Sequence, residues 1–399
     1  MELRPDLAQT HTNLGQALKD QGKLDEAIAC HRRALELKPD YADAHNNLGI
    51  ALNKQGKLDE AIACYRRALQ LKPDYVNAHG NLGSLFKDQG KLDDAIACYR
   101  RALELDPGHA AVHYNMGLTL ADQGKLDEAI ACYRRALERK PDLAEARNNL
   151  GITLKDRGRL DEAISCFRRV LALKPDHAGA HNNLGAALRE QGKLDEAIAC
   201  CRQAVALNPN DAVMRYNLGL TSRMRGRLDE ALASHRRAVA LKPDYAEAHN
   251  ELGITLKQQG KLDEAVACFR RAVALRPDLV GMLDNLGVAL LNQGKLDEAI
   301  GWLRRAVELK PDYADAYSDM GVAFHTQRKL DEAIGCYRQA VALQPDKAGA
   351  HNNLGLALRD QGKLDEAIAC LRRAVELKPQ DAAIRDNLGL VLQKRGKLA

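Results

Sequence analysis

The sequence predicts an all-α protein, a superhelical solenoid of antiparallel helix pairs, from three observations. All twelve prolines of the 399-residue chain lie on one 34-residue grid, from Pro5 to Pro379. One glycine row with the same period starts at Gly15, and a second starts at Gly22 and is interrupted only by Arg328. Aromatic residues make up only 4% of the chain, so the core must consist mainly of Ala and Leu, which favour helices.

The period also sets the expected domain organisation. With the first repeat position at Ala8, eleven complete repeats span residues 8–381. Residues 1–7 then form an N-terminal lead-in, and residues 382–399 a partial twelfth repeat with helix A and the start of helix B. A single helix pair cannot cover both of its apolar faces, so neighbouring pairs must stack into one solenoid.

Each repeat predicts two helices with a turn between them. Asp40, directly after Pro39, is expected to be the N-cap of helix A, which ends near the second glycine row. Helix B opens with Leu24-Asp25-Glu26, because acidic residues favour the positive end of the helix dipole. A helical wheel places these residues of the second repeat in the core: Ala44, Leu48, Gly49, Ala51, Leu52, Leu58, Ala61, Tyr65, Ala68 and Leu69.

These residues carry a family resemblance. The run Asn46-Asn47-Leu48-Gly49, followed by Ala61, Tyr65, Ala68 and Pro73, resembles the tetratricopeptide repeat (TPR) over nearly the whole chain. The chain departs from the family at the fourth repeat position, where the family often has Trp and this chain has His45 and its equivalents. The resemblance implies a right-handed superhelix whose concave surface is lined by A helices and binds partner proteins.

The pattern predicts no enzyme, no cofactor and no metal site. Nine of the ten cysteines share one repeat position, and successive members are one helix pair apart, roughly 10 Å, too far for a disulfide or a shared metal. We interpret them as small buried residues of an intracellular, reducing compartment and expect a cytoplasmic protein. The same spacing argues against zinc at the histidine row. No phosphate-binding loop or nucleophile motif occurs.

Charge and hydropathy limit the partners. A net charge of +5 over 399 residues argues against an obligatory nucleic-acid partner, and no apolar run is long enough for a membrane span. Doubled arginines such as Arg66-Arg67 have two possible interpretations. They form either a stripe that attracts phosphates or, as we favour, a solvated face that is ion-paired with Asp59-Glu60 and its repeats.

Asparagine recurs on the arc of helix A opposite the core. Ten of the twelve A helices carry it at the sixth repeat position: Asn13, Asn47, Asn81, Asn115, Asn149, Asn183, Asn217, Asn285, Asn353 and Asn387. An amide both donates and accepts, so such a row can bind the backbone of an extended polypeptide without reading its side chains. The alternative is a structural ladder in which each Asn bonds the next repeat.

Two further rows flank the asparagines. The ninth position is aliphatic in many repeats, and it is covered either by crowded neighbouring A helices or by a ligand. The twelfth position is often basic. These members join the predicted peptide-binding set: Ile50, Leu118, Ile152, Leu220, Ile254, Lys87, Lys155 and Arg189.

Three functions remain open from the sequence. The leading hypothesis is a non-enzymatic protein–protein interaction scaffold that binds extended polypeptide segments along a concave, Asn-lined groove. The Asn row is also similar to that of the repeat arm of O-linked N-acetylglucosamine transferases, which implies the substrate-recognition arm of a larger glycosyltransferase-type enzyme. The third is a structural array that self-associates through the uncapped apolar surface around Leu388, Leu390 and Leu392.

Overall fold

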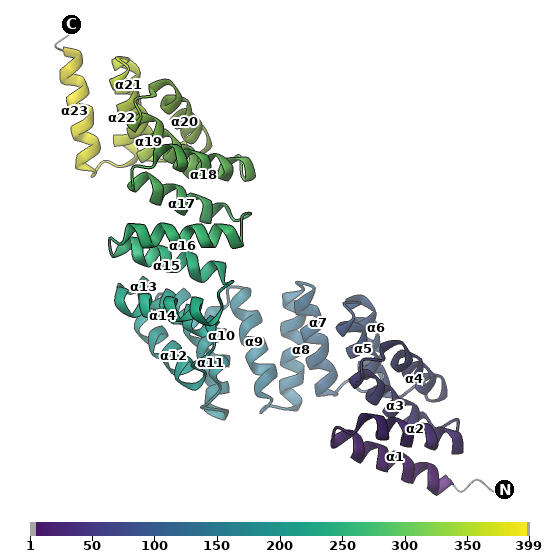
Figure 1. Cartoon of the computed structure of the whole chain (residues 1–399). Coiled ribbons are helices and arrows are strands. Elements are labelled where there is room, and N and C mark those ends of the chain that lie inside the picture. Colours follow the sequence, from purple (N-terminus) through teal and green to yellow (C-terminus); the bar gives the residue numbers. More distant parts are fainter. Residues whose placement is uncertain (1–4, 397–399) are drawn as a thin grey trace. The chain divides into compact units, whose positions relative to one another are not determined.

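The computed structural model describes the backbone of residues 5–396 and the side chains of residues 7–396, and within these limits every regular element is an α-helix. The chain forms two compact units, of which the first ends at Lys193 and the second begins at Leu194. Figure 1 labels the helices of both units in chain order. The predicted all-α class is confirmed.

The helices of the first unit have the following bounds: α1 Pro5–Asp20, α2 Leu24–Leu37, α3 Ala42–Lys54, α4 Leu58–Leu71, α5 Val76–Asp88, α6 Leu92–Leu105, α7 Ala110–Asp122, α8 Leu126–Arg139, α9 Ala144–Asp156, α10 Leu160–Leu173 and α11 Ala178–Glu190. The helices of the second unit are α12 Leu194–Leu207, α13 Ala212–Met224, α14 Leu228–Leu241, α15 Ala246–Gln258, α16 Leu262–Leu275, α17 Val280–Asn292, α18 Leu296–Leu309, α19 Ala314–Thr326, α20 Leu330–Leu343, α21 Ala348–Asp360, α22 Leu364–Leu377 and α23 Ala382–Gly396. Odd-numbered helices are A helices and even-numbered ones are B helices.

The turn inside each repeat explains the second glycine row. Gly56 has φ +82°, in the left-handed region that side chains with a Cβ disfavour. Around it the Lys57 N–H donates to the Leu52 carbonyl oxygen at 2.9 Å, which satisfies a carbonyl at the end of α3. Arg328 has φ +63° at the equivalent place, the one positive φ of a non-glycine residue in the described chain.

The predicted Asp40 cap is wrong. Helix α3 begins at Ala42 and its N-cap is Tyr41, without a side-chain hydrogen bond. Asp40 lies in the turn that follows Pro39, which the Tyr41 N–H closes by donating to the Lys38 carbonyl oxygen at 3.2 Å. The turn therefore takes up one residue more than the sequence pattern suggested.

The first and last helices can be compared with the expected lead-in and the expected partial repeat. Helix α1 begins at Pro5, inside the expected lead-in of residues 1–7. Helix α23 continues to Gly396, and the expected start of a further B helix falls on residues 397–399, outside the described residues. On α23, Leu390 is 57% exposed and Leu392 is 40% exposed. Self-association through this face stays a prediction.

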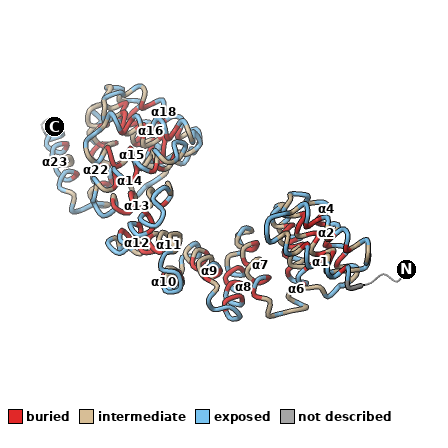
Figure 2. Tube along the Cα trace, turned by 60° about the horizontal axis from the view of Figure 1, so that its bottom comes forward, coloured by how far each residue is buried: buried red, intermediate tan, exposed pale blue. Residues whose placement is uncertain are grey.

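The core lies between the helices of successive layers (Figure 2). Eight of the ten residues that the wheel placed in the core of the second repeat are buried, while Leu58 and Leu69 are half-buried. Ile62 is buried as well, which the wheel did not predict. A Cβ on Gly49 would lie 2.7 Å from Cε1 of Tyr65, so the first glycine row admits the aromatic ring of helix B.

Successive A helices approach one another, and successive B helices do not. Within each unit, neighbouring A helices such as α3 and α5 have Cα atoms within 8 Å of one another. The described B helices show no such approach to each other. The A helices are therefore crowded on the inner side of each stack, where the Asn row lies.

No described helix combines the length and apolar character that a membrane span requires.

Candidate functional site

A hollow of about 540 Å³ opens on the A-helix side of the first unit. Its walls come from α1, α3 and α5 and from the turns before α3 and α5, with these residues: Gln9, Thr12, Asn13, Gln16, Lys19, Tyr41, Asp43, Asn46, Asn47, Ile50, Tyr75, Asn77 and Asn81. A smaller hollow of about 80 Å³ continues between α5 and α7 and shares Asn77 and Asn81 with the first. We call the two together the A-helix groove.

The groove brings several predicted residues together. Asn13, Asn47, Asn81 and Ile50 line the larger hollow, and Asn115 lines the smaller one. The remaining predicted asparagines lie half-buried at the same repeat position of later A helices: Asn149, Asn183, Asn217, Asn285, Asn353 and Asn387. Asn13 alone among the ten is exposed.

Many asparagines also bond the preceding repeat. The Asn81 side chain donates through Nδ2 to Oδ1 of Asn46 at 2.9 Å, joining α5 to α3. The same register recurs in both units, always from the sixth position of one repeat to the fifth position of the repeat before: Asn149 to Tyr114, Asn183 to Asn148, Asn285 to Asn250 and Asn387 to Asn352. We call this series the Asn ladder. The structural alternative is thus real, but each rung uses only one N–H of an amide that has two donors and an acceptor.

The ladder tolerates changes of acceptor and of donor. At Gly80 the fifth position has no side chain, and Asn115 donates instead to the hydroxyl of Ser84 at 3.3 Å. Glu251 replaces Asn at the sixth position of α15 and forms an ion pair with Arg223 at 2.9 Å. Cohesion between neighbouring A helices therefore survives several local substitutions.

The aliphatic ninth position is covered in part. Ile50, Leu118, Ile152, Leu220 and Ile254 are all half-buried, because neighbouring A helices cover one side of each. The open side of Ile50 forms part of the larger hollow. Of the two explanations for this row, crowding of the A helices accounts for part of the burial and leaves apolar surface on the groove.

The predicted basic residues are not free cations. Lys87 lies 3.6 Å from a carboxylate oxygen of Asp122. Lys155 contacts Asp156 at 2.8 Å and Glu190 at 3.7 Å. Arg189 also interacts with other residues of the chain. None of the three lines the two hollows, and the carboxylates beside Lys87 and Lys155 offset their positive charge.

Two tyrosines on the groove were missed at the sequence level. Tyr41 and Tyr75 come directly before α3 and α5, and Tyr41 donates a hydrogen bond to Oε1 of Gln9. Burial, together with Asp43, raises the pKa of Tyr75 well above its usual range, so its phenol stays a donor. The signal was present, because Tyr follows Pro-Asp on the proline grid in several repeats.

Comparisons with known proteins identify the repeat. A model of the cilia and flagella-associated protein 70 C-terminal domain, a TPR model, matches residues 73–278, more than half of the chain. Two further models, described as TPR repeat and tetratricopeptide repeat, match residues 15–56 and 51–90, and residues 250–314 and 319–382. The chain belongs to this family of tetratricopeptide repeats.

This TPR protein shares its fold with the crystal structure of the APC/C hetero-tetramer Cut9–Hcn1, with a TM-score of 0.53, 14% identity and 96% of each chain covered. It is also similar to yeast Tom70, with a TM-score of 0.44, 17% identity, and 98% of this chain and 96% of that one covered. A third is YrrB, described as a TPR protein with an unusual peptide-binding site, with a TM-score of 0.41, 26% identity, and 45% and 92% covered. The search of curated proteins gave no match.

The family assignment supports the general role of an interaction scaffold, because TPR proteins are generally non-enzymatic scaffolds. The finer likeness of the Asn row to a glycosyltransferase arm stays a prediction.

The histidine row of the TPR units has a structural contact. Nε2 of His45 lies 3.0 Å from the carbonyl oxygen of Pro39, six residues earlier. His79, His113, His181, His249 and His351 repeat this contact. The row thus ties each A helix to the proline turn before it. Among the described residues no group of three or more His, Cys, Asp or Glu side chains is arranged to hold a metal ion.

The cysteines are free thiols. Burial raises the pKa of Cys64 and of Cys268 to about 11, and neighbouring Glu60 and Glu264 add to the shift. At neutral pH these thiols are protonated and therefore poor nucleophiles.

The outer face of the B helices is ion-paired in part, and these repeats fit the favoured interpretation of the arginine rows. Arg32 contacts Glu60 of the next B helix at 3.1 Å, and Arg270 contacts Glu298 in the same way at 2.7 Å. These exposed pairs contribute little energy individually. They occupy several arginines of this row, such as Arg134 and Arg338, whereas Arg66 and Arg100 form no ion pair among the described residues.

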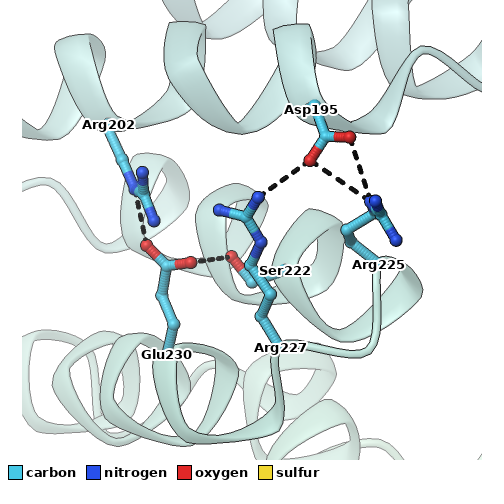
Figure 3. A network of polar contacts seen from close by, with 6 residues as sticks. All are labelled: Asp195, Arg202, Ser222, Arg225, Arg227 and Glu230. Atoms are coloured by element: carbon cyan, nitrogen blue, oxygen red, sulfur yellow. Dashed lines mark hydrogen bonds and ion pairs between the residues drawn. The ribbon is translucent and has the colours of Figure 1, made fainter.

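Figure 3 shows a network of such polar contacts in the second unit. Glu230 of α14 accepts from Arg202 of α12 at 2.7 Å and from Ser222 at 3.0 Å. Burial opposes ionisation, yet these two hydrogen bonds hold the pKa of Glu230 below its usual range. Asp195 binds Arg225 and Arg227 beside it. The network joins α12, α13 and α14 across successive repeats.

Proposed function

We propose that this TPR protein binds an extended polypeptide segment along the A-helix groove. The observation that carries the proposal is the composition of the larger hollow. Seven of its thirteen lining residues have amide side chains, and two are tyrosines. Such a wall offers donors and acceptors with little net charge.

The hydrogen-bonding groups that the ladder leaves unused on the amides are complementary to a polypeptide backbone. Each ladder bond occupies one Nδ2 hydrogen, which leaves a second N–H and carbonyl lone pairs on that side chain. A polypeptide in extended form presents alternating N–H and C=O groups, each of which needs a partner when it is removed from water. Amides on successive A helices therefore supply partners at repeating intervals.

The expected affinity is moderate. Each hydrogen bond contributes about 0.5–1.5 kcal/mol net, and micromolar binding corresponds to roughly 8 kcal/mol. Six to eight engaged amides reach that range before the cost of ordering the polypeptide. Contact with Ile50 and with the rings of Tyr41 and Tyr75 adds apolar burial. We infer a groove that tolerates many sequences and selects for extended conformation.

The test replaces two amides that form no rung of the Asn ladder. Asn77 lines both hollows, and Asn47 accepts only a weak 3.4 Å contact from Asn46 of its own helix. The double variant Asn47→Ala/Asn77→Ala should weaken binding by about 5- to 100-fold, which corresponds to the loss of two hydrogen bonds. The probes are peptides selected on the wild-type protein from a random phage-displayed library and measured by fluorescence anisotropy.

The matched control is Gln70→Ala on the outer end of α4, where the side chain contacts only Arg67. Its affinity should equal that of the wild type. The proposal is wrong if the double variant keeps wild-type affinity with unchanged circular dichroism, or if selection yields no peptide that the wild type binds.

A further inference from the structure

One rung of the Asn ladder in the second unit has two carboxyl groups in place of two amides. The ladder pairs each sixth-position side chain with the side chain 35 residues earlier, as in the 3.0 Å bond from Asn285 to Asn250. The same register pairs Asp319 of α19 with Asp284 of α17. When both carboxyls are ionised, neither has a hydrogen to donate and the rung cannot form.

The pair is largely shielded from solvent. Oδ1 of Asp284 has essentially no exposed surface and no hydrogen-bond partner in the described chain. Its other oxygen, Oδ2, accepts from the Tyr313 hydroxyl at 3.3 Å. A shielded carboxylate oxygen without a donor is costly, and a proton on the facing carboxyl would supply the missing donor.

Charges around the pair have both signs. Asp315 of α19 adds a third carboxylate, and Lys347, which precedes α21, forms an ion pair with Asp315. Lys257 of α15 attracts the ionised forms of both aspartates, and Tyr337 of α20 is influenced by Asp319. Three carboxylates against two ammonium groups leave the cluster one charge negative when every acid is ionised.

The titration of both acids moves toward neutral pH. Burial, and secondarily Asp315, raises the pKa of Asp284 to about 6. Burial, followed by the charge of Asp284, raises the pKa of Asp319 to about 7. Like charges that face each other out of water hold a proton between them in this way.

We propose that Asp284 and Asp319 share one proton near neutral pH, so that this rung is a carboxyl–carboxylate hydrogen bond that opens when the proton leaves. Opening transfers the proton to solvent, breaks one O–H···O⁻ bond and adds one negative charge to the A-helix side of the second unit. If that side binds polypeptide, as the proposed function holds, the same event strengthens its attraction for lysine- and arginine-bearing segments.

The decisive variant is Asp319→Asn, which restores the amide that occupies this position in ten other repeats. Its Nδ2 can donate to Oδ1 of Asp284 at every pH. A carboxyl group with a raised folded-state pKa stabilises the fold below its unfolded pKa and loses that contribution as pH rises through the folded value. The thermal midpoint of wild type should therefore fall from pH 5 to pH 8 relative to that of Asp319→Asn.

Asp315→Asn serves as the matched control, because it removes a neighbouring carboxylate and leaves the pair intact. It should retain most of the pH-dependent difference from Asp319→Asn, because burial and the charge of the facing carboxyl remain when the smaller contribution of Asp315 is lost. In the wild type, carbon-detected NMR of the aspartate carboxyls should show two coupled titrations well above pH 4.

Titration of both carboxyls near pH 4, or an identical pH profile for wild type and Asp319→Asn, would overturn the inference. Neither measurement contains a peptide, so a failure of the proposed function leaves them unaffected. A lysine-rich peptide whose affinity for the wild type does not change between pH 5 and 8, while the carboxyls titrate as described, would reject only the coupling to binding.

Discussion

A buried histidine in the first repeat predicts that this end of the chain loses stability in acid. His31 of α2 has no exposed surface, and neither ring nitrogen has a hydrogen-bond partner in the described chain. It occupies the repeat position that Tyr65 fills in the next repeat and Phe167 in the fifth, each packed against a glycine of the preceding A helix. The perturbation we choose is therefore His31→Phe, for which the chain itself provides the packing template.

The change in stability expected for His31→Phe is the result of two effects. At pH 7 the substitution removes buried nitrogens without partners, which is worth about 1–3 kcal/mol. Burial, with a smaller contribution from Lys19, lowers the pKa of His31 from 6.5 to about 4. Such a group is neutral in both states above pH 6.5, and as pH falls toward 4 only the unfolded chain takes up the proton. Between pH 7 and pH 5 the wild type loses at most about 2 kcal/mol for this reason, whereas His31→Phe loses none of it.

Hydrogen exchange resolved by mass spectrometry is the appropriate assay. His31 lies in the first repeat, and the end of a repeat array can open locally, so the amides of α1 and α2 report its effect more directly than a global midpoint does. In His31→Phe these amides should exchange more slowly at pH 7, and the gain over wild type should grow at pH 5. Tyr65→Phe is the control and should not change the pH dependence. Equal pH dependence in wild type and His31→Phe, after correction for intrinsic exchange, would show that protonation of His31 does not destabilise the first repeat.

Two further predictions concern glycine positions. Arg328→Gly should raise the free energy of unfolding of the second unit by about 1 kcal/mol, because Arg328 has φ +63° at a turn position that glycine occupies in the other repeats. Urea unfolding measures this gain. A loss of stability would mean that contacts of the arginine side chain outweigh its backbone strain. Gly49→Ala should destabilise the first unit by about 1–3 kcal/mol, because the new Cβ would lie 2.7 Å from the Tyr65 ring. The double variant Gly49→Ala/Tyr65→Leu should recover part of that loss in thermal unfolding, and the explanation is wrong if it recovers none.

The repeat made most of the fold predictable from sequence. Proline and glycine at fixed positions end helices by local sterics, which act without knowledge of the tertiary structure. The start of helix B at Leu24 and the burial of Ala61 and Tyr65 followed directly. The error in the predicted N-cap also has a local cause, because an Asp after Pro is compatible with either an N-cap or a turn. In the structure Asp40 lies in the turn, and Tyr41 is the N-cap of α3.

The site was predictable only in part, because it depends on pairs of residues that a single-position pattern does not reveal. The Asn row was evident, but the residue at the fifth position varies among amide, hydroxyl and carboxyl side chains, and a variable position gives no periodic signal. The register of 35 residues, rather than 34, arises because the donor and acceptor are adjacent positions on neighbouring helices. That offset comes from the stacking of the helices in three dimensions.

The Asn ladder and the A-helix groove share the same side chains, so cohesion and binding are linked in this chain. An amide that donates one N–H to the preceding repeat is held in orientation, and its carbonyl becomes a somewhat better acceptor through polarisation. Asn81 illustrates the consequence, because its bond to Asn46 joins α5 to α3 while both residues line the larger hollow. A polypeptide that bonds such an amide would meet a preorganised group and lose less entropy than with a free side chain. Substitution of ladder residues should therefore change stability and affinity together, whereas Asn77, outside the ladder, should affect affinity alone.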